Sequence, residues 1–183
     1  MNAEICMTEA KNGSAQAQYN LATMYRLGHQ LPQNQDLAFK WYRRAAKQGL
    51  SDAFCSLGVM SFLLESDDKS KAIKYWNKAA AMGNALAMGK LGLLYQEGRY
   101  VPKDLQKSHI LFKKAAKQGD AGAQFFLGMM YARKQLFKKA AKLLSFSAEQ
   151  NLNQESATDC ANCRYQMNVH VQTPTHEQEQ INE

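Results

Sequence analysis

The chain has 183 residues, a hydrophobic fraction of 45% and a formal net charge of +7 at pH 7. It contains no run of about 18 apolar residues, so no membrane span is predicted. Residues 1–6 lack the basic and apolar regions of a secretion signal. The four cysteines lie either far apart or close together near the C-terminal end. Reduced thiols and a cytoplasmic location are therefore expected.

The strongest pattern in the chain is a recurring five-residue phrase. It occurs at 45–49 (AAKQG), 79–83 (AAAMG), 115–119 (AAKQG) and, more faintly, 147–151 (SAEQN). Successive copies lie 34, 36 and 32 residues apart, which is typical of helix–turn–helix solenoids. The sequence therefore predicts an all-α fold, a right-handed α-solenoid of four repeats with capping helices.

The array begins with a half-repeat at residues 1–13. Residues 9–13 echo the closing phrase one period before Ala45, so residues 2–12 are expected to form a lone second helix of a pair. Ile5 and Cys6 then take the positions of Trp41 and Tyr42, and the helix caps the first full pair. An alternative stays open, in which the chain is a shortened relative of a longer array and self-associates through exposed apolar ends.

Four full repeats follow, at residues 14–49, 50–83, 84–119 and 120–151. The first helix of each repeat carries Ala and Leu at four-residue steps, which places these residues on one buried face. A column of small residues on this helix opposes a column of bulky residues on the second helix, so that the two approach closely. The small column is Ala22, Gly58, Gly92 and Gly128, and the bulky column is Tyr42, Trp76, Phe112 and Leu144.

The first repeat resembles the Sel-1-like repeat, a relative of the tetratricopeptide repeat, at residues 17–25, at Gly28, at 32–36 and at 41–49. The third repeat is as similar, through Gly98 and residues 101–104 and 112–116. The second and fourth repeats lack the family's Gly and Val-Pro-x-Asp loop, so shorter loops are expected between their helices. The resemblance covers roughly residues 1–151 and implies a non-enzymatic scaffold that binds other proteins.

The tetratricopeptide architecture implies that the first helices line a concave groove. We expect a peptide or helix of a partner to bind there, with Tyr19, Phe62, Phe125 and Met129 as anchors and with room beside Gly89 and Gly122. The expected groove residues are Gln16, Tyr19, Thr23, Arg26, Asp52, Cys55, Val59, Phe62, Leu86, Gly89, Leu93, Gln96, Phe125 and Met129. The function expected is that of an adaptor, and the alternative is an immunity-type inhibitor of one dedicated partner.

Charge is divided unevenly along the chain. Residues 150–183 carry a net charge of −4 and the remainder +11, much of it on the second helices. A basic convex face suits an anionic partner, although lysines also favour helix C-termini electrostatically. Neither exposed aromatic residues nor a recognisable reading helix accompanies the lysines, so binding to nucleic acid is not predicted.

The C-terminal end departs from the repeat pattern. Residues 152–169 are expected to form a capping helix, and the polar residues 170–183 a flexible tail. Two thiols and two imidazoles in this region match the number of ligands that tetrahedral zinc takes, but not the spacing of a zinc finger. These residues are Cys160, Cys163, His170 and His176. No metal, cofactor or catalytic residue is predicted. The alternative to a protein-binding function is a zinc-binding or hydrolytic role for this cluster.

Overall fold

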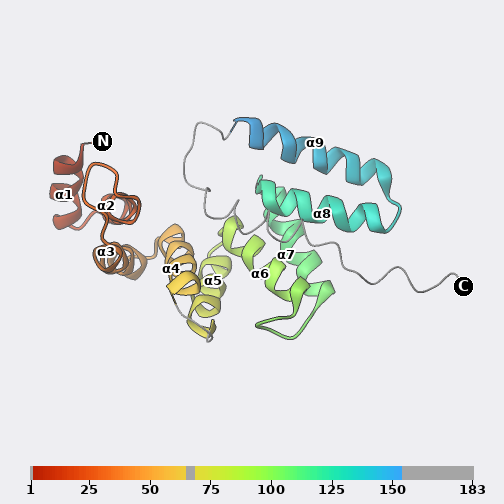
Figure 1. Cartoon of the computed structure of the whole chain (residues 1–183), viewed down its shortest axis with the longest axis horizontal. Helices are drawn as coiled ribbons and strands as arrows, with labels where there is room; N and C mark the ends of the chain where they lie inside the picture. The colour runs from red at the N-terminus through yellow and green to blue at the C-terminus, as the bar shows by residue number, and fades with distance from the viewer. Residues whose placement is uncertain (1, 65–68, 154–183) are drawn as a thin grey trace, which may run out of the picture. The chain divides into compact units, whose positions relative to one another are not determined.

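The computed structural model describes residues 2–64 and 69–153, and all of its regular secondary structure in these ranges is α-helical. Residues 1–147 form one compact unit, and 148–153 are the described part of a second. In chain order the helices are α1 (Ala3–Lys11), α2 (Ala15–Leu27), α3 (Gln35–Lys47), α4 (Ser51–Leu64), α5 (Ser70–Ala81), α6 (Ala85–Glu97), α7 (Leu105–Lys117), α8 (Ala121–Arg133) and α9 (Phe137–Asn153) (Figure 1). We call α2, α4, α6 and α8 the first helices and the odd-numbered ones the second helices. The predicted all-α repeat architecture is confirmed.

Polar side chains fix where most first helices begin. The side-chain oxygens of Ser14, Asn84 and Asp120 accept hydrogen bonds from the backbone N–H groups of the third residue of α2, α6 and α8, at 3.3, 2.9 and 2.6 Å. Each side chain satisfies one of the N–H groups that a helix N-terminus leaves without an intrahelical partner. In the first, third and fourth repeats, a polar residue at the same position of the repeat therefore caps the start of the first helix.

The recurring phrase is the C-terminal turn of the second helices. At the end of α3, the N–H groups of Gln48 and Leu50 both donate to the carbonyl of Ala45, and Gly49 adopts a φ of +87°. Side chains with a Cβ rarely adopt this left-handed conformation, which explains the glycine. In the fourth repeat the phrase ends in Asn151 instead of glycine, and α9 continues to Asn153.

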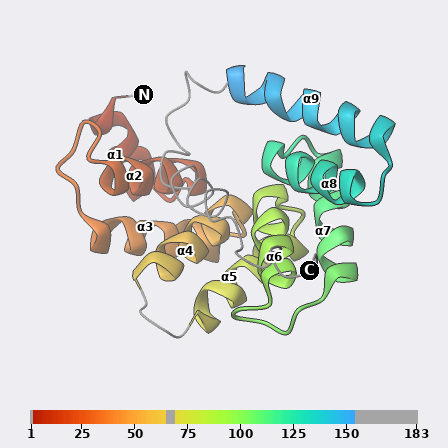
Figure 2. The ribbon, with the colours of Figure 1, turned by 45° about the vertical axis from the view of Figure 1, so that its right-hand side comes forward.

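The opposed small and bulky columns form the contact between the two helices of each repeat. A Cβ atom added to Gly58 would lie 2.5 Å from the ring of Trp76, and one added to Gly92 would lie 2.9 Å from the ring of Phe112. Both distances are shorter than any ordinary contact, so only glycine allows these pairs to close. Helix packing then continues from each repeat to the next, from α3 to α4, from α5 to α6 and from α7 to α8 (Figure 2).

The loops inside the repeats follow the expected difference in length. The first and third repeats have matching loops at 28–34 and 98–104, each closed by a hydrogen bond from its last residue to Tyr25 or Tyr95 at 2.8 and 2.9 Å. In the fourth repeat only residues 134–136 separate α8 from α9. In the second repeat Lys69 precedes α5, and its Nζ donates to the carbonyl of Phe62 at 2.7 Å, which closes the end of α4.

Two expectations lie partly or wholly outside the described residues. The capping helix at 152–169 and the tail at 170–183 fall there except for 152–153, which belong to α9. Cys160, Cys163, His170 and His176 also lie outside. At the other end, α1 lies within residues 1–13, and Cys6 on this helix is fully buried, as Tyr42 is on α3.

Candidate partner-binding face

The expected groove residues lie on the first helices, but their surroundings differ from one helix to the next. On α2, three of them gather around the hydroxyl of Tyr42, which reaches them from α3. Arg26 Nε donates to Tyr42 Oη at 3.3 Å, Thr23 Oγ1 lies 2.9 Å from the same oxygen, and Thr23 Oγ1 donates to the carbonyl of Tyr19 at 3.1 Å. The Tyr19 ring packs on that of Tyr42, with 5.4 Å between centroids. Tyr19, Thr23 and Arg26 are therefore parts of the contact between α2 and α3.

The remaining expected residue on α2 is free of that cluster. Gln16 is exposed, and its side-chain amide donates to Asn20 Oδ1 on the same helix at 3.1 Å. The amide group is accessible from solvent, so Gln16 fits a contact position at the rim of this face.

Helix α4 is the part of the face that differs most from expectation. Cys55 is only 3% exposed and packs in a core cluster with Trp76 and Ala79, and Trp76 Nε1 donates to its carbonyl at 3.2 Å. A side chain so buried cannot contact a partner, and we leave Cys55 out of the face. Burial also raises the pKa of the other described thiol, Cys6.

The other expected residues of α4 already have neighbours within the chain. Asp52 Oδ1 accepts from Asn84 Nδ2, at the start of α6, at 2.7 Å. The Phe62 ring lies between those of Trp76 and Tyr100, at 5.3 and 5.5 Å, and Val59 is half-buried in the same cluster. Their side chains therefore stabilise the contact between the second and third repeats.

Helices α6 and α8 provide the exposed apolar part of the face. Leu86 on α6 is 42% exposed, and Phe125 and Met129 on α8 are 38% and 40% exposed. Phe126, next in sequence, instead stacks on the buried Phe112 at 5.3 Å, and the Phe125 ring meets Phe126 edge-on at 5.6 Å. A contiguous exposed apolar surface is typical of protein contact sites, and Phe125 and Met129 lie four residues apart on one side of α8. We call Leu86, Phe125 and Met129 the apolar patch.

The two glycines beside this patch serve a different contact from the one expected. A Cβ on Gly89 would lie 3.2 Å from Asp120 Oδ1, and a Cβ on Gly122 would lie 3.4 Å from the same atom. The room beside them is therefore bordered by the carboxylate that starts α8. Nearby on α6, Leu93 is half-buried against the next repeat, and Gln96 Oε1 is buried with no hydrogen-bond partner within the described ranges.

Charge is segregated between the two sets of helices. Helices α3, α5 and α7 carry eleven basic residues and one acidic residue, Asp36, whereas the four first helices carry three basic and two acidic residues. The first-helix face is thus nearly neutral and the second-helix surface is basic. Repulsion from Lys134 and Lys113 adds to burial in lowering the pKa of His109, which lies on α7.

Two kinds of feature are not found among the described residues, a cluster of metal ligands and a membrane-spanning helix. Within 2–64 and 69–153, no three His, Cys, Asp or Glu side chains come together as metal ligands would. The helices of the same ranges are too short or too polar to cross a bilayer.

Comparison with known proteins matches this chain to a repeat family. The family profile of the Sel1 repeat matches residues 15–50, 57–84, 85–120 and 121–152. A putative sel1-like repeat-containing protein of Acanthamoeba polyphaga mimivirus is 29% identical over 141 residues, which are 66% of this chain and 27% of that protein. The chain thus spans about a quarter of the length of that relative.

Solved structures share the fold. A Sel1 repeat protein from Oxalobacter formigenes has a TM-score of 0.73 and 29% identity, and the alignment covers 81% of this chain and 63% of that one. An immunity protein from Pseudomonas aeruginosa has a TM-score of 0.61 and 26% identity, with 79% of this chain and 56% of that one covered.

Proposed function

Because the chain belongs to the Sel1 repeat family, we propose that it is a non-enzymatic protein-binding module, which holds a segment of another protein against its first helices. The observation that supports this most is the apolar patch on α6 and α8. Its three side chains are 38% to 42% exposed, whereas other apolar residues of these helices, such as Met88 and Leu127, are buried in a core cluster. Burying such side chains in a contact is favourable by roughly 25 cal/mol for each Å² of apolar area removed from water.

The proposed contact is centred on the third and fourth repeats. There the glycines Gly89 and Gly122 lie on the same two helices as the apolar patch. Phe125 and Met129 are four residues apart, so their side chains share one face of α8. On α2 and α4 the corresponding positions are used for internal contacts, which leaves Gln16 as an outer contact. A peptide or short helix with apolar side chains at similar spacing is the partner segment that fits.

The test compares two double variants, each of which truncates two exposed apolar side chains to alanine, one pair on α8 and the other on α7. Phe125→Ala/Met129→Ala removes most of the patch, and Leu105→Ala/Ile110→Ala removes side chains of α7 that are 52% and 53% exposed. Partners captured from the native cell by the wild-type chain are identified by mass spectrometry, purified and titrated against both variants by calorimetry. We expect the patch variant to weaken binding at least ten-fold and the α7 variant to change it less than two-fold.

The result that contradicts the proposal is equal affinity for the wild-type chain and the patch variant. Thermal melts of both variants distinguish loss of contact from loss of folding, because truncation of an exposed side chain changes stability little. If the α7 variant alone loses the partner, the binding surface lies on the second helices and the proposed face is wrong.

The similarity to immunity proteins of Pseudomonas aeruginosa favours a second candidate, in which the chain neutralises one dedicated partner protein. An inhibitor of that kind forms a tight complex of fixed stoichiometry, whereas an adaptor binds several partners more weakly. Native mass spectrometry of the captured material separates the two. One partner at a ratio of one to one favours the inhibitor, and several partners that exchange during washing favour the adaptor.

A further inference from the structure

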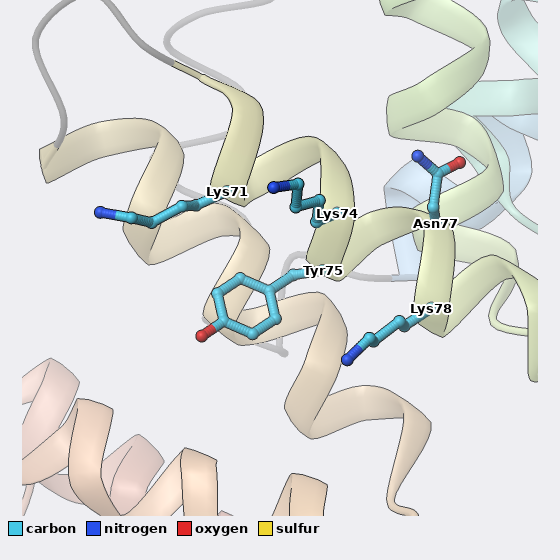
Figure 3. Close-up of a pocket in the computed structure, with 5 residues that line it drawn as sticks. All are labelled: Lys71, Lys74, Tyr75, Asn77 and Lys78. Atoms are coloured by element: carbon cyan, nitrogen blue, oxygen red, sulfur yellow. The ribbon is translucent and has the colours of Figure 1, made fainter.

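Helix α5 carries an open, basic hollow outside the first-helix face. Lys71, Lys74, Tyr75, Asn77 and Lys78 line a volume of about 390 Å³, and the Lys74 and Lys78 side chains lie on either side of the tyrosine ring while Lys71 extends away from it (Figure 3). The lysines lie three and four residues apart, so they share one side of the helix. All three are exposed, and Tyr75 is half-buried.

The helix dipole does not account for this arrangement. Lysines are favoured by the dipole only in the last turn of a helix, and an N-terminal position is unfavourable for a positive charge. In α5, which spans Ser70–Ala81, only Lys78 lies in the last turn, while Lys71 is the second residue and Lys74 the fifth. The sequence of the helix itself contains no acidic residue.

We propose that this hollow on α5 binds an acidic, carboxylate-rich segment of a partner protein. Charge complementarity supports the choice, because Lys74 and Lys78 offer two ammonium groups one turn apart, and Asn77 and the Tyr75 hydroxyl, which line the same hollow, add hydrogen-bond donors. Two carboxylates at i and i+4 of a helix, or at alternate positions of an extended chain, match this spacing. The site is distinct from the apolar patch and does not depend on it.

The aromatic residues near the hollow favour a peptide over a nucleic acid. Proteins that bind single strands usually present open aromatic faces on which bases stack. Here Lys78 Nζ lies 5.6 Å from the centre of the Phe54 ring, and the Tyr75 and Phe54 rings are 6.5 Å apart. One of the lysines of the hollow therefore covers the Phe54 ring.

The experiment uses the full chain and a fluorescein-labelled twelve-residue peptide of repeating Glu-Glu-Leu, titrated by fluorescence anisotropy at low ionic strength. We expect saturable binding that weakens at least ten-fold when about 0.5 M NaCl is added, because salt screens charges at the surface. Lys74→Glu/Lys78→Glu should weaken binding at least ten-fold. The matched control, Lys113→Glu/Lys117→Glu on α7, makes the same change in net charge and should weaken it less than three-fold.

Three outcomes overturn the proposal. The first is no binding of the acidic peptide, and the second is an equal loss in both charge-reversal variants, which indicates a diffuse field rather than a site. The third is binding of labelled oligothymidylate in preference to the peptide, which indicates a nucleic-acid surface. Circular dichroism and melting of each variant confirm that it is folded, and Phe125→Ala/Met129→Ala should bind the peptide as the wild-type chain does. Failure at α5 is thereby separated from failure at the apolar patch.

Discussion

The hydroxyl oxygens of Thr23 and Tyr42 lie 2.9 Å apart and connect α2 to a tyrosine of α3 that is fully buried. The direction of the proton follows from the neighbours. Arg26 Nε can only donate to Tyr42 Oη, and Thr23 Oγ1 donates to the carbonyl of Tyr19, so the Tyr42 hydroxyl donates to Thr23. A continuous series of hydrogen bonds therefore fastens one end of α2 to α3.

Removing the central hydroxyl should lower stability. We expect Tyr42→Phe to reduce the free energy of unfolding by about 1 kcal/mol, because it takes a partner from both Thr23 and Arg26 while it keeps the buried ring. The control is Tyr95→Phe, which removes a hydroxyl that accepts a bond from exposed Lys107 Nζ at 2.7 Å. Urea denaturation should show a loss below about 0.5 kcal/mol for the control. Equal losses of unfolding free energy in the two variants would mean that the hydrogen bonds through the Tyr42 hydroxyl add no more to stability than an exposed one.

Glycines of the first helices should respond to alanine in opposite directions. Gly92→Ala places a methyl group 2.9 Å from the Phe112 ring, so we expect destabilisation by about 1–3 kcal/mol. Gly122→Ala meets only Asp120 Oδ1 at 3.4 Å, an ordinary contact, and alanine should stabilise α8 by up to about 1 kcal/mol. Thermal melting of both variants measures the difference. A stable Gly92→Ala protein would show that α6 and α7 separate at little cost.

The two aromatic residues first expected to act as equivalent anchors should also separate. Tyr19 packs on buried Tyr42 at 5.4 Å, whereas Phe125 is 38% exposed. We expect Tyr19→Ala to lower the free energy of unfolding by more than about 1 kcal/mol and Phe125→Ala by less than about 0.5 kcal/mol. Chemical denaturation of the two single variants provides the comparison. A larger loss for Phe125→Ala would place that ring in the core and remove it from the proposed face.

The contrast between these residues shows what periodicity can predict. A column such as Gly58, Gly92 and Gly128 follows from the repeat, because both helices of the contact belong to the same repeat and their spacing fixes which residues meet. Some groove positions depend also on the neighbouring repeat. Cys55 is covered within a cluster that includes Ala87 and Leu91 of the third repeat, and the accessibility of such a position changes with the size of these neighbours.

Long-range polar pairs were beyond the sequence for a related reason. Asp52 is separated from Asn84 by 32 positions, and each residue alone fits a helix start or an exposed surface. Lys69 similarly looks like a surface lysine, yet it is only 8% exposed and bonds the carbonyl of Phe62. The first contact joins the second repeat to the third, and the second lies across the end of α4; the repeat pattern specifies neither of them.

A histidine of α7 should make stability depend on pH. Burial, with repulsion from Lys134 and Lys113, lowers the pKa of His109 in the folded protein, and its ring meets Tyr131 edge-on at 5.8 Å. The unfolded chain therefore binds more protons than the folded chain once the pH falls below about 6.5, the ordinary pKa of histidine. The free energy of unfolding should then decrease as the pH is lowered through this value towards the folded-state pKa.

Variants separate the pH dependence due to His109 from that due to the carboxylates, which also titrate in acid. His109→Gln should show a shallower decrease between about pH 7 and pH 5 than the wild-type chain. His29→Gln, in the exposed loop 28–34, is the matched control for the substitution itself. Urea denaturation at each pH provides the free energies. Parallel profiles for the wild-type chain and His109→Gln would show that the imidazole is as easily protonated in the folded array as in the unfolded chain, and that α7 and α8 do not exclude its charge.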